Sequence, residues 1–196
     1  LKGVVVDVMS SVAGLREAYT RLTELFVDLK NPRDTEEVEV FLADDKKREN
    51  FYNLLCALGK ALNIVLNAEQ TYAAVPKDEL KQYQNTFIFF SKVRRSVKIR
   101  YCDAIDNREY EPLMQNLLDT HLSVAGLKQI TNPIDILNKD DFERELEELG
   151  SLRAKADAIT SKLTRSISEK YHENPAYYDS FSKRIKDALD QYKEKV

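Results

Sequence analysis

The chain has 196 residues, of which 43% are hydrophobic and 32% are charged, and its formal net charge is −3. This composition is typical of a folded globular protein and excludes an intrinsically disordered chain. The slightly acidic balance excludes a global basic field that would draw the protein to DNA or to a membrane surface. The sequence has no apolar run long enough to span a membrane, so we expect a cytoplasmic protein with no membrane partner.

Helical periodicity runs through most of the chain, because only five glycines and five prolines interrupt it. The sequence opens on Leu1 and the apolar run GVVVDVM, so we expect a fragment of a longer chain. Only Gly3–Val8 alternates enough to suggest a strand. Helix-start signals include Asp34, either Asp44 or Asp45, and Asn174-Pro175. The pattern predicts helices at about 12–29, 35–43, 45–65, 78–106, 112–122, 140–149, 151–171 and 175–192.

We therefore predict an all-α protein, an irregular bundle of about seven or eight helices that ends in a C-terminal helix pair. Residues 1–30 would form a connecting helix, 31–140 a helical bundle and 141–196 the C-terminal helices, all in one structural domain. An irregular connection is expected at 126–140, since Asn132-Pro133 interrupts the helical pattern. The last helix is expected to bury Tyr177, Phe181, Ile185, Ala188 and Tyr192.

Two short motifs suggest a phosphate or metal site but lack the residues that such sites need. Gly59-Lys60 resembles the end of a phosphate-binding loop, yet Leu54 stands where that loop needs a glycine. Glu169-x-x-His172 has the spacing of half a di-iron site, but the second half is missing, because Leu118 stands three residues before His121. We therefore expect no catalytic residue, cofactor or metal in this chain.

The two cysteines give no sign of nucleophilic chemistry. Cys56 and Cys102 lie inside apolar helical patterns, with no histidine nearby in the sequence and no spacing that would pair them. These features indicate reduced thiols in the protein core.

The run YQNTFIFFSKVRRSVKIRY, residues 83–101, interleaves aromatic rings with five Lys and Arg residues. Such a composition suits either a surface that stacks nucleic-acid bases or a core helix with charges at its edge. A projection at about 100° per residue gathers the rings away from most of the cations, which favours the core helix. Ile88 and Ile99 lie on the far side, so a second covered surface is expected. Arg94 falls within the apolar stripe and needs a carboxylate or cation–π partner, in the fold or on another chain.

Three segments of the chain resemble one protein family. The run FFSKVRRSVKIRYCDAID resembles the F-L-S-K-I-R-x-x-x-x-x-R-Y helix that follows the motor domains in R subunits of type I restriction enzymes. The run KADAITSKLTRSISEKYHENPAYYDSFSKRIKDAL resembles their C-terminal E-K…(D/N)-P-x-(F/Y)-Y segment, and VAGLREAYTRLTELF is similar to the helix that leaves their second RecA-like domain. The positions that fall on these motifs, expected to be architectural or partner-docking, are Lys92, Arg94, Arg100, Tyr101, Lys155, Glu169, Lys170, Asn174, Pro175 and Tyr178.

The resemblance implies a parent protein with an N-terminal PD-(D/E)xK nuclease, two helicase-like ATPase domains and this helical domain. Such an R subunit joins a methyltransferase core of two M subunits and one S subunit, translocates DNA with ATP and Mg, and cuts it. Residues 1–30 would then be the connector that follows the motor domains. The resemblance assigns no catalytic residue to this fragment. It implies a restriction-modification domain that braces the motor and docks on the M subunit.

Two functions follow as alternatives. In the first, the chain is a non-catalytic assembly domain whose last two helices, from Ser151 onward, dock on the partner; these helices could equally pack on residues 78–122. In the second, the five cations of the helix at 83–101 contact the translocated DNA directly, which would require a segregated basic face.

Overall fold

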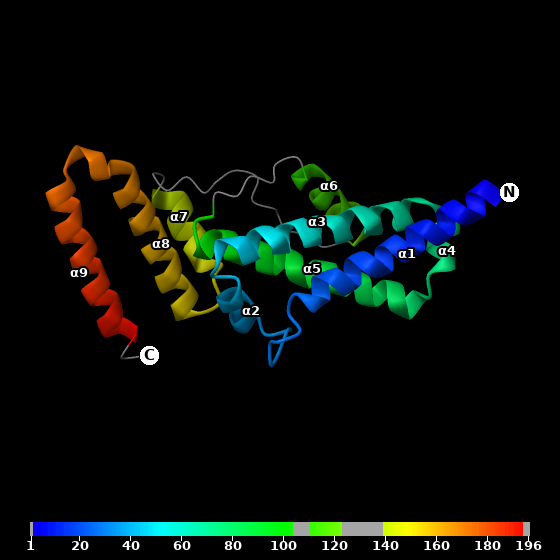
Figure 1. The fold of residues 1–196 in the computed structure, drawn as a ribbon, viewed down its shortest axis with the longest axis horizontal. Coiled ribbons are helices and arrows are strands. Elements are labelled where there is room, and N and C mark those ends of the chain that lie inside the picture. The colour runs from blue at the N-terminus through cyan, green and yellow to red at the C-terminus, as the bar shows by residue number, and fades with distance from the viewer. Residues whose placement is uncertain (1, 104–109, 123–138, 194–196) are drawn as a thin grey trace. The chain divides into compact units, whose positions relative to one another are not determined.

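The computed structural model describes residues 2–103, 110–122 and 139–193. Within these residues the chain is all-α, as predicted, and no strand occurs (Figure 1). The elements are α1 (Lys2–Glu24), α2 (Thr35–Phe41), α3 (Asp45–Asn67), α4 (Glu69–Ala74), α5 (Lys77–Arg100), α6 (Glu111–Asn116), the π-helical segment η1 (Leu117–His121), α7 (Lys139–Glu147), α8 (Leu152–Lys170), the 3₁₀ turn η2 (Tyr171–Glu173) and α9 (Pro175–Lys193).

The described elements form two compact units. The first contains α1 to α4, α5 up to Val97, α6 and η1, and the second contains the last turn of α5 with α7, α8, η2 and α9. The predicted division at residues 30 and 140, within one structural domain, stays a prediction. No helix in the described ranges is both long and apolar enough to cross a membrane.

Helices α2 and α3 begin at predicted places, where an aspartate side chain caps each N-terminus. Asp34 accepts a hydrogen bond from the Glu37 amide at 2.9 Å at the start of α2. Asp44, one of the two candidates before the third helix, accepts from the Lys47 amide at 3.0 Å. These bonds satisfy amides that have no partner inside the helix, which is why short polar residues mark these starts in the sequence.

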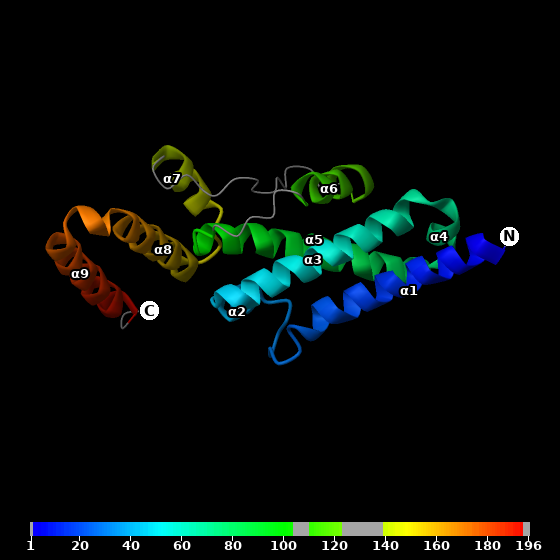
Figure 2. The same ribbon diagram turned by 45° about the horizontal axis from the view of Figure 1, so that its top comes forward.

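The core of the first unit is aromatic and lies between α1, α3 and α5, which run side by side in both views (Figures 1 and 2). Beyond the C-terminal end of α1, Phe26 stacks on Phe90 of α5, with ring centroids 4.8 Å apart, and meets Phe51 of α3 edge-on at 5.7 Å. Both Phe87 and Val97 of α5 are also fully buried. The aromatic stripe of residues 83–101 is therefore a core face, and the interpretation as a core helix is confirmed.

Three details differ from the sequence expectations. Gly3–Val8 is helical rather than a strand, because α1 already begins at Lys2 and a single short strand without a neighbour is not stable. The short helix α4 was not predicted, and α5 ends at Arg100 rather than near Asp106. Most of the irregular connection predicted at 126–140 lies outside the described residues.

Gly59 of α3 lies against the ring of Phe87 on α5. It is buried in the middle of α3, and a Cβ atom placed on it would lie 3.0 Å from Cε2 and 3.3 Å from Cζ of Phe87. A helix interior offers no free amides for a phosphate, so the structure gives Gly59 a packing role.

We predict that Gly59→Ala lowers the free energy of unfolding by about 1–2 kcal/mol, because the added methyl group overpacks the contact with Phe87. Gly14→Ala is the matched control: Gly14 lies in α1, and a Cβ atom added to it would have nothing within 4 Å. This control should gain about 0.5–1 kcal/mol from helix propensity alone. Urea denaturation measures both, and equal gains in stability for the two variants would contradict the packing role.

Candidate functional site

Arg94 is fully buried in α5, and both of the alternative partners expected for it, a carboxylate and an aromatic ring, are present. Its Nη1 atom donates to Oε2 of Glu111 at 3.1 Å, and its Nη2 atom donates to the other carboxylate oxygen. The guanidinium also lies over the ring of Tyr52, 5.2 Å from the centroid. Since Glu111 is itself 2% exposed, this is a two-bonded ion pair enclosed in the first unit. The expected partner is thus within the fold.

Arg100, at the end of α5, is buried in the second unit. Its Nε and Nη2 atoms donate to Oδ2 of Asp157 on α8 at 2.9 and 2.6 Å. Lys98 is also buried, so Arg94, Lys98 and Arg100 all lie inside the protein. The projection placed Lys98 and Arg100 at the edge of the helix, and for these two residues it is wrong. Because three of the five cations are enclosed, α5 lacks the segregated basic face on which the DNA-contacting alternative depends.

The end of α5 is a tight turn built on Cys102. The Cys102 amide donates to the carbonyl of Ile99 at 3.3 Å and the Asp103 amide to the carbonyl of Lys98 at 3.1 Å, with Cys102 in the left-handed region at φ 46°. This bonding pattern usually carries glycine at the left-handed position, because a Cβ atom is strained there. A cysteine in its place gives no sequence signal, which explains why the end of α5 was predicted too late.

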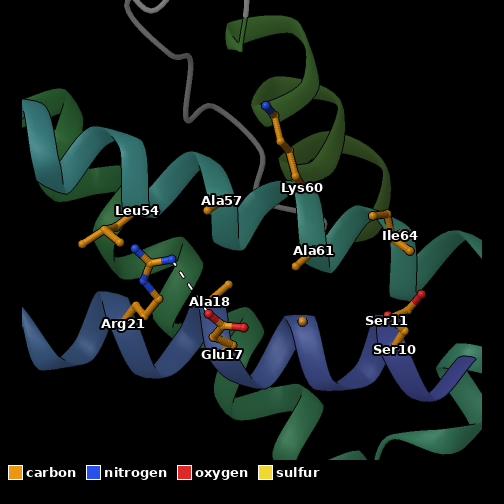
Figure 3. Close-up of a pocket in the computed structure, with 11 residues that line it drawn as sticks. Ser10, Ser11, Glu17, Ala18, Arg21, Leu54, Ala57, Lys60, Ala61 and Ile64 are labelled. Atoms are coloured by element: carbon orange, nitrogen blue, oxygen red, sulfur yellow. Dashed lines mark ion pairs between the residues drawn. The ribbon is translucent and has the colours of Figure 1, made fainter. Parts of the chain in front are cut away.

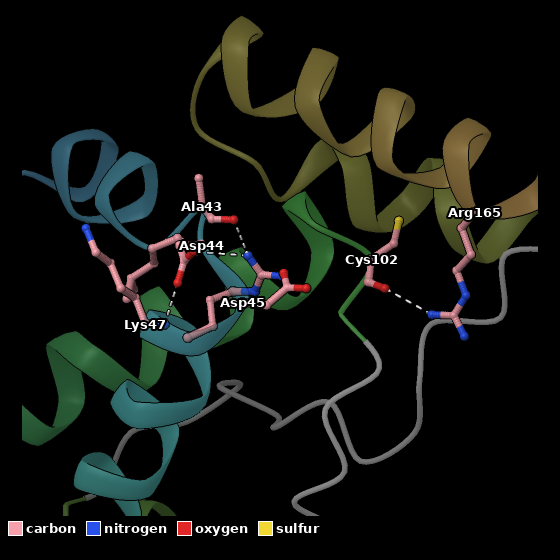
Figure 4. A network of polar contacts seen from close by, with 8 residues as sticks. Ala43, Asp44, Asp45, Lys47, Cys102 and Arg165 are labelled. Carbon is pink, nitrogen blue, oxygen red and sulfur yellow. Dashed lines mark hydrogen bonds and ion pairs between the residues drawn. The ribbon is translucent and has the colours of Figure 1, made fainter. Parts of the chain in front are cut away.

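Contacts with α8 hold this turn in place. Arg165 donates from Nη1 to the Cys102 carbonyl at 3.1 Å (Figure 4), and the Cys102 sulfur lies 3.7 Å from the carbonyl of Ala158. Burial raises the pKa of the Cys102 thiol to about 11, so the thiol remains protonated at neutral pH. Ala154 and Ala158, with exposed fractions of 1% and 0%, form the buried face of α8 and allow its backbone to approach closely.

The apolar residues spaced three and four apart along α8 form a stripe on a different face from the one that packs against the turn: Leu152, Ala156, Ile159, Leu163 and Ile167. Leu152 is 70% exposed and Ile159 is 44% exposed, whereas Ala156, Leu163 and Ile167 are half-buried. The small alanines, rather than the large aliphatic residues, therefore attach α8 to its own unit.

The expected burial of the apolar residues of α9 is wrong for those whose side chains are described. Tyr177 is 57% exposed and Ala188 is exposed, while Phe181 and Ile185 are half-buried. The side chain of Tyr192 lies outside the described part. The physical reason is that α9 packs on α8 and η2 in a helical hairpin, and one neighbouring helix can cover only part of a helix face.

The ten residues singled out from the sequence do not form a single cluster, because Lys92 and Arg94 belong to the first unit and the other eight to the second. Lys92 is exposed on α5. Tyr101 is half-buried, and the Cζ atom of Arg100 lies 5.7 Å from the centroid of the Tyr101 ring. On α8, Lys155 is half-buried and Lys170 is exposed at the last position.

The remaining predicted residues surround the turn between α8 and α9. Glu169 accepts a hydrogen bond from Arg165 at 3.1 Å. It belongs to no metal-ligating cluster, since no group of three or more His, Cys, Asp or Glu residues suited to a metal occurs in the described part of the chain. Asn174 caps α9 by accepting from the Tyr177 amide at 3.1 Å, and Pro175 is the first helical residue, as predicted. Tyr178 is half-buried. Their role in docking stays a prediction.

One family of proteins matches the chain: type I restriction enzyme HindI endonuclease subunit-like, C-terminal, whose sequence model aligns with residues 33–196. The chain belongs to this family. The resemblance to type I restriction subunits is thereby confirmed, and the matched residues run from just before α2 through α9. Comparisons with curated proteins and with solved structures find no match.

Between α1 and α3 of this restriction-subunit domain lies a groove of about 500 Å³ that the sequence analysis did not predict (Figure 3). Its walls are made mainly of small residues, and its charged rim contains Glu17, paired with Arg21 at 3.9 Å, and Lys60, whose Nζ atom lies 4.0 Å from the centre of the Tyr110 ring. No His or Cys lines it, so it has no nucleophile–base pair involving either residue. Small residues four apart on both helices are the only sequence signal for it.

We predict that Arg94→Met lowers the free energy of unfolding by about 3–5 kcal/mol, because it leaves the Glu111 carboxylate buried without its cation. The double variant Arg94→Met/Glu111→Leu should recover most of that loss, since no charge is then enclosed. Chemical denaturation of the single and double variants measures the difference. A double variant no more stable than Arg94→Met would contradict the ion-pair explanation.

The raised pKa of Cys102 predicts loss of stability at alkaline pH. The thiol has its ordinary pKa of 9.0 in the unfolded chain and a pKa of about 11 in the folded protein. Its contribution to the free energy of unfolding is therefore fully present below pH 9 and is lost as the pH rises to 11. Under reducing conditions, wild type should lose about 1–2 kcal/mol more over this range than Cys102→Ala, which lacks the thiol. Parallel stability curves for the two proteins between pH 8 and 11 would contradict this.

Proposed function

We propose that this chain is the non-catalytic assembly domain of a type I restriction endonuclease R subunit, which braces the motor domains and docks on the methyltransferase M subunit. The observation that carries the proposal is the partly uncovered apolar stripe of α8, in which Leu152 and Ile159 are exposed, in a domain that the family model matches over residues 33–196. An amphipathic helix whose apolar face is left open is a common way of binding a partner protein.

The bracing role is supported by the way α1 is held. Arg16 forms two hydrogen bonds with Glu79 of α5, at 2.7 and 3.1 Å, and the ring of Tyr19 lies 4.6 Å from that of Tyr83. The hydrogen bond from the Arg16 guanidinium lowers the pKa of the Glu79 carboxyl, because it stabilises the ionised form. Side chains along α1 thus fix this helix to the first unit, as a brace for preceding domains requires.

The parent enzyme would supply the chemistry. Its nuclease and helicase-like domains would bind DNA, ATP and Mg, and it would act in the cytoplasm within a complex of R subunits and the M and S subunits. In this proposal the helical domain contributes binding energy and geometry, and no residue of it takes part in the reaction.

Size-exclusion chromatography of the chain with the purified M subunit of the same restriction system tests the docking role. We expect the two proteins to elute together, because the open stripe of α8 is present in the isolated chain. The full R subunit with the same M preparation is the positive control. Separate elution of the chain, with co-elution of the full R subunit, would contradict docking through this domain.

A further inference from the structure

The two sides of α8 differ in what they contact. At about 100° per residue, Leu152 and Ile159 lie on roughly the opposite side of the helix from Ala154 and Ala158. The alanine side is buried against the turn at Cys102, whereas Leu152 and Ile159 are 70% and 44% exposed. The helix is therefore fixed to its own unit by one side and presents large aliphatic groups on the other.

Aromatic residues beside the turn that joins α8 to α9, beyond the C-terminal end of α8, are exposed as well. The ring of Tyr177 stacks on that of Phe181 at 6.0 Å and meets Tyr178 edge-on at 5.2 Å, and it is still 57% exposed. Tyr171 in η2 is 42% exposed and donates to Asp179 at 3.1 Å. Rings already held by neighbours lose little freedom on binding, and tyrosine is enriched among the residues that dominate binding energy.

The charge of this segment indicates the chemistry of its partner. Residues 152–193, the C-terminal hairpin of α8, η2 and α9, contain nine Lys and Arg residues and six Asp and Glu residues, a net charge of +3. The whole chain has a net charge of −3. Two hairpins would repel each other, whereas an acidic surface would attract one. Duplex DNA is acidic too, but its phosphate backbone offers no apolar groove in which Leu152 and Ile159 could be buried.

We propose that the C-terminal hairpin binds an apolar groove with an acidic rim on a partner protein, with Leu152, Ile159 and Tyr177 as the buried anchors. The exposed cations Lys183 and Arg184 of α9 face acidic side chains at the rim. The inference rests on the proposed function, since it takes the M subunit as the partner, and it adds the side chains and the charge sign that the contact uses.

The decisive measurement is the affinity of the full 196-residue chain for the purified M subunit, by isothermal titration calorimetry. Ile159→Ala and Tyr177→Ala should each weaken binding about tenfold or more, because each removes an anchor from a desolvated pocket. Val27→Ala is the matched control, since Val27 is 74% exposed in the first unit, and it should change the affinity by less than about twofold. Circular dichroism of each variant verifies that the helices are intact.

A second pair of variants tests the charge. Lys183→Glu/Arg184→Glu should weaken binding about tenfold or more at low salt, and the loss should shrink as salt rises. Lys46→Glu, an exposed reversal on α3, is the control and should have little effect. Stronger binding by the reversed variant would overturn the proposed acidic rim.

The remaining outcomes separate this inference from the proposed function. If wild type does not bind the M subunit while the full R subunit does, the proposed function fails and the inference fails with it. If wild type binds and the anchor variants bind equally well, docking stands and the C-terminal hairpin is not the contact. Duplex DNA binding lost in the reversed variant, or a dimer of the chain lost in Tyr177→Ala, would assign the surface to DNA or to a second copy and overturn the inference.

Discussion

Burying an arginine on α5 requires a carboxylate to meet it, and each of the two units is organised round one such pair. In the first unit Glu111 reaches Arg94 from the start of α6, and in the second Asp157 reaches Arg100 from α8. An enclosed cation without its partner costs several kcal/mol, so neither arginine can remain buried unless that element packs at that place. The apolar residues of α5 could pack against many different helices. We infer that the two arginines determine which helices pack there, because each needs a carboxylate.

The second unit shows why a hydrophobic pattern does not by itself identify the buried side of a helix. On α8 the large apolar residues form the obvious stripe, but the attachment uses Ala154 and Ala158 because small side chains let the backbone of α8 reach the turn at Cys102. Only a close approach brings Asp157 to Arg100 and Arg165 to the Cys102 carbonyl. The side of α8 that packs is therefore the one that carries small residues and hydrogen-bonding groups, and the large apolar residues lie on another side.

Local features were therefore predictable from the sequence, and the choice of partners was not. The caps at Asp34 and Asn174 and the core face of α5 depend on residues within a few turns of one another, so their patterns are visible along the chain. That Arg94 needs a partner follows from its position in the stripe, but Glu111 lies beyond the end of the helix. For Arg100 the projection gave the wrong place: Ile99 indicated a second covered surface, but nothing in one helix shows that Arg100 would be buried there by a carboxylate of α8.

Exposed apolar residues are ordinary on protein surfaces when they occur singly, so exposure alone would not distinguish the hairpin. Val27 is more exposed than any of the proposed anchors and has no such significance. What distinguishes the hairpin is that Leu152 and Ile159 recur at helical spacing on a helix already fixed through its opposite side. Such a helix cannot rotate to bury its stripe without breaking the pair between Arg100 and Asp157. The ion pair that builds the second unit is therefore also what keeps the apolar stripe available to another protein.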